Sequence, residues 1–207
     1  MKQFVKTVFF ASCVSAALSA HVSAQTAADG GGKQVCESIV WDGGDLSYEA
    51  SRYSWRRSIR SDNFMLLWDH GFGDDPRTAP ALAGRDMTCD PQHVLDKCEE
   101  FYAYYRDTLK FLNEGSNADR YLMMCMLNYV LDDTAYGGSV GDAIGALWVT
   151  PARVRDEKLN CIAHELGHAF QFQLSIDSGS GFGGGSAYEM TSQWMLWQVN
   201  PDLIKDE

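Results

Sequence analysis

The sequence is poor in positive charge. Lysine and arginine contribute 17 residues against 28 aspartates and glutamates, which gives a formal net charge of −11. An acidic surface of this kind disfavours nucleic acid and anionic membranes as partners, because both are negatively charged. The chain of 207 residues is 45% hydrophobic, which is enough for one folded domain with its own core. These features indicate a soluble globular protein.

The sequence also has no apolar run long enough to span a membrane. The N-terminal run over residues 7–20 follows two lysines and is shorter than a bilayer requires. Val22-Ser23-Ala24 then supplies the small residues of a signal-peptidase site. We therefore expect residues 1–24 to be a signal peptide, and the protein to be secreted or periplasmic. Its loss would leave 15 basic against 28 acidic residues, a net charge of −13.

Cysteine spacing gives no clear disulfide framework. Phe10-Ala11-Ser12-Cys13 weakly matches a lipoprotein cleavage site, which is the alternative to simple export. If Cys13 leaves with the signal peptide, five cysteines remain, an odd number that leaves the connectivity open. Cys89 and Cys98 are the plausible local pair in an exported protein.

Apolar patterning predicts a mixed domain in which strands come before most of the helices. A helix beginning at Asp90-Pro91 shows apolar residues at helical spacing through about residue 113. Residues 132–142, which contain three glycines, read as a turn region. The next helix is predicted from about residues 152–155 to Leu174. Gly- and Ser-rich residues 178–186 form a predicted loop, and a last helix covers 187 to about 198. Strands are predicted at 63–68, 121–131 and 146–150.

His164-Glu165-Leu166-Gly167-His168 is the stretch that carries chemistry. Two histidines four residues apart lie on one helical face, so both imidazoles can reach a single cation. The glutamate between them points to one side of the pair, where it can accept a proton without binding the metal. The pattern is typical of a catalytic zinc site.

A catalytic zinc site needs a third protein ligand and a position left open for water. Leu174 stands where an extended motif would place a third histidine, which excludes metzincin-type ligation. Of the downstream acids, Asp177 adjoins the predicted loop and three others lie near the end of the chain. Glu189 is better placed, because it is early in a helix that can fold back across the motif helix.

The chain resembles the gluzincin metallopeptidases, in which HExxH is followed by a glutamate about twenty residues later on the next helix. Residues 164–171 are also similar to the HExGHxxQ form of enhancin-like, mucin-directed metallopeptidases. They are closer still to a secreted bacterial family known as a domain of unknown function, which shares stretches around Asn63-Phe64, Tyr136-Gly137-Gly138 and Gln193-Trp194. The resemblance is specific over about residues 160–198.

The resemblance implies a zincin-like α+β fold, with a small mixed sheet packed on helices and the predicted strand at 146–150 at its edge. It further implies that His164, His168 and Glu189 bind Zn²⁺. Glu165 would then act as general base, and Gln171 would support the site. Such an enzyme would be a secreted endopeptidase, active on protein or glycoprotein as a monomer.

Several alternatives stay open. Ser186 and Glu189 also have the spacing of a capping box, and Cys161, one turn before His164, could join a closed structural zinc site. Gly167 suggests close approach of another backbone, for which the 146–150 strand is the candidate, with Trp148 on it a core or a subsite residue. A zincin-fold module that binds glycan or protein without catalysis is a further alternative. The oxyanion donor is undecided among Tyr136, Tyr188 and His70.

The expected organisation is a signal peptide, a flexible leader and irregular segment over residues 25–60, and a metallopeptidase domain over 61–207. The chain ends soon after the second site helix, where related enzymes carry more structure. Whether this is a complete domain, a truncated one or a degenerate enzyme is left open by the sequence, as are substrate and cleavage specificity.

Overall fold

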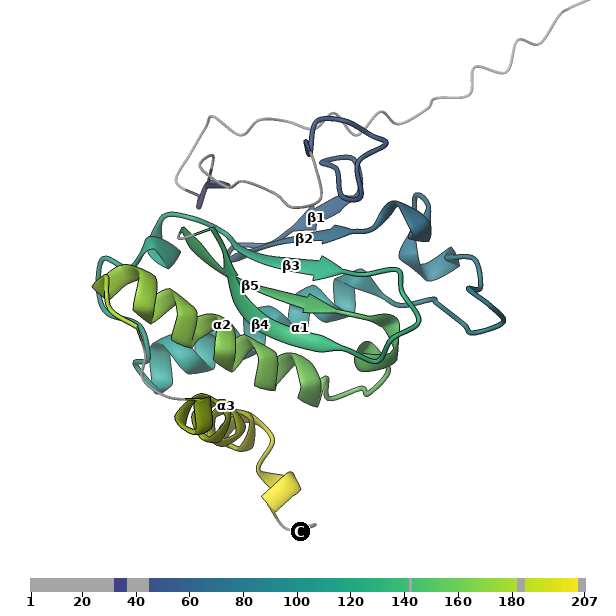
Figure 1. The fold of residues 1–207 in the computed structure, drawn as a ribbon. Helices are drawn as coiled ribbons and strands as arrows, with labels where there is room; N and C mark the ends of the chain where they lie inside the picture. Colours follow the sequence, from purple (N-terminus) through teal and green to yellow (C-terminus); the bar gives the residue numbers. More distant parts are fainter. Residues whose placement is uncertain (1–31, 37–44, 142, 182–184, 205–207) are drawn as a thin grey trace, which may run out of the picture.

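The computed structural model describes residues 32–36, 45–141, 143–181 and 185–204. The predicted signal peptide and the start of the leader lie outside these residues. One five-stranded sheet organises the described chain, in the order β1-β2-β3-β5-β4 (Figure 1). The strands are β1 (Ser58–Arg60), β2 (Phe64–Trp68), β3 (Met123–Leu127), β4 (Ala135–Val140) and β5 (Ile144–Val149).

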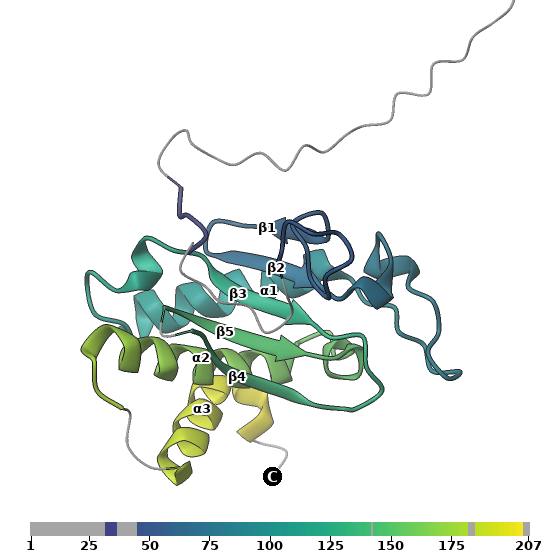
Figure 2. The same ribbon diagram turned by 45° about the horizontal axis from the view of Figure 1, so that its top comes forward.

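The three central strands are parallel and the two outer ones are antiparallel to their neighbours. Side chains alternate between the two faces of a sheet, so the cross-strand neighbours Cys125, Leu147 and Gly137 point to one face. On that face the Cys98 thiol of helix α1 (Pro91–Ala103) contacts Cys125, and helix α2 (Asn160–Ser178) approaches Gly137. Both helices therefore cover the same face, as Figure 2 also shows.

The sheet is mixed and small, which confirms the α+β class predicted from the sequence. Strands β2 and β3 lie within the predicted runs and β5 overlaps the run at 146–150 but begins at Ile144, and all residues of β2 and β3 are buried. A third helix, α3 (Gly185–Val199), crosses α2 and contacts it extensively. Within the described ranges, no helix combines the length and apolarity needed to cross a membrane.

Residues 132–142 do not form the predicted turn. They contain β4, which is the outer strand of the sheet, whereas β5 lies between β3 and β4. The prediction of an edge strand at 146–150 is therefore wrong. Strand β4 was not predicted because Gly137 and Gly138 suggested a turn. In the fold, Gly137 instead allows β4 to approach α2 closely.

Two helix boundaries also differ from the prediction. Asp90 caps α1 and Pro91 occupies its first turn as expected, but the α-helix ends at Ala103 and continues as a π-helical segment, Tyr104–Thr108. The motif helix does not start at residues 152–155. A 3₁₀ turn ends at Val154, and α2 starts at Asn160 after Leu159 adopts a left-handed conformation (φ 48°).

Residues upstream of 61 contribute to the core, which the predicted boundary of the domain did not anticipate. Leu46 and Tyr53 are buried, and the Arg57 guanidinium donates to the carbonyls of Glu49, Ser51 and Arg52. The packed domain therefore includes this irregular segment. The described cysteines are free thiols, so the predicted Cys89–Cys98 pair is not formed.

Candidate metal centre

Helix α2 places the two histidines side by side on one of its faces, with His164 partly exposed and His168 buried. Its other face is buried through Ile162, Ala163, Leu166 and Phe170, among others, which fixes the rotation of the helix against the sheet. The Nε2 atoms of His164 and His168 lie 3.1 Å apart, with their rings nearly perpendicular at 81°. The i, i+4 spacing thus produces the converging imidazoles that the sequence predicts.

Helix α3 brings the third group to the pair. The Glu189 carboxylate lies 3.2 Å from His164 Nε2 through Oε2 and 3.4 Å from His168 Nε2 through Oε1. Ser192, one turn further along α3, is fully buried and donates its hydroxyl proton to the carbonyl of His164. The carboxylate is directed at the imidazoles, which is not the geometry of a capping-box interaction.

The close crossing of α2 and α3 depends on Gly167. A Cβ atom at that position would lie 2.6 Å from Ser192 Oγ and 3.1 Å from Ser192 Cα. The expectation that Gly167 accommodates a β-strand is therefore wrong, because its neighbour is α3. The glycine that meets the sheet is instead Gly137, whose Cβ would lie 1.9 Å from the Glu165 carbonyl oxygen.

The distances between these donor atoms fit a zinc ion. Zinc binds imidazole nitrogen and carboxylate oxygen at about 2.0–2.2 Å in tetrahedral sites, so two of its ligand atoms lie roughly 3.3 Å apart. The separation of 3.1 Å between the two Nε2 atoms agrees with that value, and each Glu189 oxygen lies at a similar distance from one imidazole, 3.2 Å for Oε2 to His164 and 3.4 Å for Oε1 to His168. Among the described residues this is the one group of three or more His, Cys, Asp or Glu side chains that could hold a metal ion.

Gln171 holds His168 in position from behind. Its side-chain oxygen lies 3.0 Å from His168 Nδ1, and its amide nitrogen donates to the backbone carbonyl of Tyr188 at 2.9 Å. Because the amide nitrogen is used by Tyr188, the oxygen faces the ring and accepts the Nδ1 proton. His168 Nε2 then carries the lone pair that a metal requires.

Glu165 lies beside the three converging groups but is not one of them. Burial raises the pKa of its carboxyl, and the nearby Glu189 carboxylate acts in the same direction. The two histidines and a hydrogen bond donated by the backbone N–H of Gly137 act against this shift in pKa. The carboxyl is thus anchored to β4 and has a raised proton affinity, which suits a group that accepts and releases a proton.

Two competing ligands that the sequence left open, Asp177 and Cys161, lie outside the cluster. Asp177 accepts hydrogen bonds from the Ser116 hydroxyl, from the Asn117 N–H at 2.9 Å and from the Gln173 amide at 2.8 Å. Cys161 is not among the converging donor atoms, and burial raises the pKa of its thiol to about 11. Neither residue completes a closed metal site in this arrangement.

The three candidate oxyanion donors lie in different places. Tyr136 neighbours Gly137 on β4, so its side chain points to the opposite face of the sheet, where it stacks on Trp148 with ring centroids 4.6 Å apart. The His70 ring lies 3.2 Å from the Asp69 carboxylate after β2. Tyr188 directly precedes Glu189 on α3, and its ring packs against Phe172 of α2.

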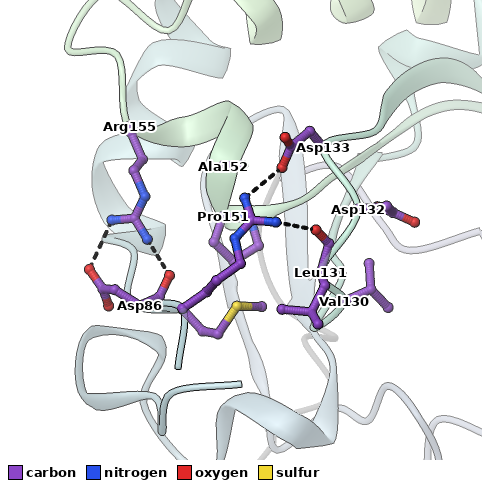
Figure 3. Close-up of a pocket in the computed structure, with 10 residues that line it drawn as sticks. Asp86, Val130, Leu131, Asp132, Asp133, Pro151, Ala152 and Arg155 are labelled. Carbon is purple, nitrogen blue, oxygen red and sulfur yellow. Dashed lines mark hydrogen bonds and ion pairs between the residues drawn. The ribbon is translucent and has the colours of Figure 1, made fainter. Parts of the chain in front are cut away.

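A separate hollow of about 400 Å³ lies beyond the carboxyl ends of β3 and β5 (Figure 3). Both of its arginines are paired within its own wall: Arg155 pairs with Asp86 at 3.0 Å, and Arg85 pairs with Asp133 at 2.9 Å. Arg85 also donates to the carbonyl of Leu131. Because each guanidinium is already neutralised, we interpret this hollow as a structural junction between two loops.

Three features of the site were not predicted from the sequence: the contact of Ser192 with Gly167, the bond from Gly137 to Glu165, and the carbonyl of Tyr188 as the partner of Gln171. Gly167 did indicate a close approach, but a glycine does not identify which segment approaches it. The resemblance around Tyr136-Gly137-Gly138 was the signal that pointed to these glycines. In the structure, Gly137 is the one that lies against Glu165 and His168.

The arrangement defines a small mixed α+β domain with a two-histidine, one-glutamate cluster at the crossing of two helices. The chain belongs to the family of unknown function DUF6055, whose model matches residues 28–207. Comparison with curated proteins and with solved structures found no match for it.

Proposed function

We propose that the protein is an exported, zinc-dependent endopeptidase with a zincin-like fold of the gluzincin type. The observation that carries this proposal is the convergence of His164, His168 and Glu189 at zinc-like separations, with Glu165 adjacent and outside the cluster. The predicted signal peptide supports export, and the acidic chain supports a protein or glycoprotein substrate over nucleic acid.

In this proposal His164, His168 and Glu189 would hold the ion. When bound, zinc supplies the Lewis acidity that lowers the pKa of a water and polarises a carbonyl. Glu165 accepts the proton of the attacking water and transfers it to the leaving amine. The N–H of Gly137 orients the Glu165 carboxylate for both transfers, and Gln171 fixes the His168 ring.

The outer edge of β4 supports a polypeptide substrate. β4 pairs with β5 along one edge and ends the sheet on the other. Its Gly137 lies directly against Glu165 and His168, so a peptide added along this edge would pass the site. Strand addition of this kind gives affinity through backbone hydrogen bonds, independent of side chains.

The second candidate is a non-catalytic module of the same fold that binds glycan or protein. It is favoured by the position of Tyr136, which points away from the site and is half exposed in a stack with Trp148. One of the three expected oxyanion donors is thereby removed from consideration. A third candidate, a structural zinc domain that uses Cys161, receives no support from the donor geometry.

Metal content and hydrolysis together test the proposal. We expect one zinc per chain in purified protein by inductively coupled plasma mass spectrometry, lost in His164→Ala and Glu189→Ala but kept in Cys161→Ser. We expect casein or mucin-type glycoprotein to be cleaved by the zinc-loaded protein and not by Glu165→Gln, which keeps its zinc. Zinc binding without any hydrolysis would favour the non-catalytic module, and zinc loss in Cys161→Ser would favour the structural site.

A further inference from the structure

An aromatic pair lies next to the metal centre and has no role in holding it. Phe172 of α2 and Tyr188 of α3 contact each other with ring centroids 5.9 Å apart and ring planes inclined by 48°. Phe172 follows His168 by one helical turn, and Tyr188 directly precedes Glu189. Despite its size, Phe172 is 38% exposed to solvent.

Packing of the helix crossing does not explain this exposure. The buried residues of α3 are Ser192, Met195 and Leu196, and Ser192 is the one that meets Gly167 and the His164 carbonyl of α2. Glu165, His168 and Phe172 have the spacing i, i+3, i+7, which places all three on one face of α2. The Phe172 ring therefore extends the open face of the site. Gln171 fixes Tyr188 beside it through the Tyr188 carbonyl.

Two glycine contacts show how β4 runs along this face. Gly137 of β4 lies against Glu165 and His168, whereas Gly145 of β5 lies against Ala169. Gly145 is paired with Ser139, and its N–H donates to the side chain of Gln173. From Gly137 to Ser139, β4 thus advances toward the C-terminal end of α2, the end that carries Phe172.

This direction determines which part of a substrate would reach the aromatic pair. Antiparallel pairing is somewhat more stable than parallel pairing, so we take a peptide on the edge of β4 to run antiparallel to it. Its N-terminal part then lies toward Phe172. Four helical residues from His168 to Phe172 span about 6 Å, which corresponds to roughly two residues of an extended peptide.

We infer that Phe172 and Tyr188 form an apolar subsite for a substrate side chain about two residues before the cleaved bond. The inference rests on the proposed peptidase function and names its specificity. Leucine, methionine and phenylalanine side chains fit such a subsite, because they bury apolar area against the exposed Phe172 ring. An aspartate or glutamate would lose its hydration there without an ionic partner from either ring.

The test uses one set of fluorescein-labelled decapeptides of alanine and serine, each with a single Leu, Gly or Asp at a defined position. With zinc-loaded protein and mass-spectrometric location of the cut, we expect Leu two residues before the cut to give about tenfold higher kcat/KM than Gly. In Phe172→Ala that ratio should fall to near one. Trp194→Ala, an exposed aromatic on the face of α3 opposite Ser192, should leave the ratio unchanged.

Peptide binding to zinc-loaded Glu165→Gln, measured by fluorescence anisotropy, separates this inference from the proposed activity. We expect the Leu peptides to bind about tenfold more tightly than the Gly peptides, and the double variant with Phe172→Ala to lose that preference. Apolar preference without hydrolysis would uphold the subsite and refute the peptidase. Two results would overturn the subsite alone. One is hydrolysis or binding that shows no preference for Leu, and the other is a preference for Leu that is unchanged in Phe172→Ala. No binding by any peptide would also overturn it.

Discussion

The Gln171 side-chain oxygen lies 3.0 Å from Nδ1 of His168, while the amide of the same residue donates to a carbonyl of α3. One buried side chain thus fixes the tautomer of the His168 ring and ties together the two helices that carry the candidate donor atoms. Hydrogen bonds to the outer nitrogen of a ligand histidine commonly contribute tenfold to hundredfold in metal affinity.

We therefore predict that Gln171→Ala weakens zinc binding about tenfold to hundredfold, measured by competition with a chromophoric chelator. Gln171→Glu is the matched control, because its carboxylate still accepts the Nδ1 proton but no longer donates to Tyr188. Its zinc affinity should stay closer to that of the wild type. Equal losses in the two variants would show that the tie between the helices, and not the bond to His168, governs the affinity.

Two adjacent glycines of β4 give a second prediction, on stability. A Cβ at Gly137 would lie 1.9 Å from the backbone oxygen of Glu165, whereas at Gly138 the nearest atom, on Trp148, is 3.6 Å away. Gly137→Ala must push β4 away from α2, and we expect it to lower the free energy of unfolding by about 1–3 kcal/mol or more. The same substitution should also break the hydrogen bond from the backbone N–H of Gly137 to the Glu165 carboxyl.

Gly138→Ala is the control for that experiment, because a Cβ at an ordinary contact distance requires no movement. Its free energy of unfolding in urea should stay within about 0.5 kcal/mol of the wild type. If both alanine variants were equally stable, the close contact between β4 and α2 would be wrong.

Much of this fold could be predicted because local signals coincide with the final elements. The apolar run at β2, the Asp90-Pro91 start of α1 and the HExxH spacing each specify structure within a few residues. β4 could not be predicted, because its two glycines have poor strand propensity, and the helix that packs against Gly137 is distant in the sequence. Glu189 could be placed near the histidines from the sequence. The crossing of α2 and α3 that brings it there, however, depends on contacts between residues far apart in the sequence, such as Gly167 and Ser192.

Lys33 gives a prediction on pH. Burial, together with the charge of Arg106, lowers the pKa of this lysine to about 8, although its ammonium donates to the Tyr102 hydroxyl at 2.8 Å. Between pH 8 and the usual lysine value near 10.5, the unfolded chain holds more protons than the folded one. Stability contributed by this group therefore rises with pH in that window, and below pH 8 the full cost of the buried charge is present.

We expect this contribution to be roughly 1 kcal/mol between pH 8 and 9.5, after allowance for the part of the side chain that water still screens. Urea unfolding over this range should show the wild type gaining about that much stability relative to Lys33→Met as the pH rises, because the other titrating groups are the same in both proteins. Lys158→Met, which removes an exposed lysine, serves as the control and should keep the wild-type dependence on pH. A Lys33→Met variant with the wild-type dependence on pH would contradict the lowered pKa.

Asp177 and Glu189 are two of the acids that the sequence offered as a third ligand, and the fold gives them different surroundings. Asp177 joins the C-terminal part of α2 to the turn at Ser116 and Asn117, whereas Glu189 is 70% exposed at the side chain and faces the histidines. Asp177→Asn should therefore cost about 1–3 kcal/mol of stability and leave zinc content at one per chain. Glu189→Gln should lose zinc while its metal-free form unfolds at the same urea concentration as the metal-free wild type, since an exposed carboxylate contributes little to folding. Zinc loss in Asp177→Asn, with normal zinc in Glu189→Gln, would place the metal elsewhere.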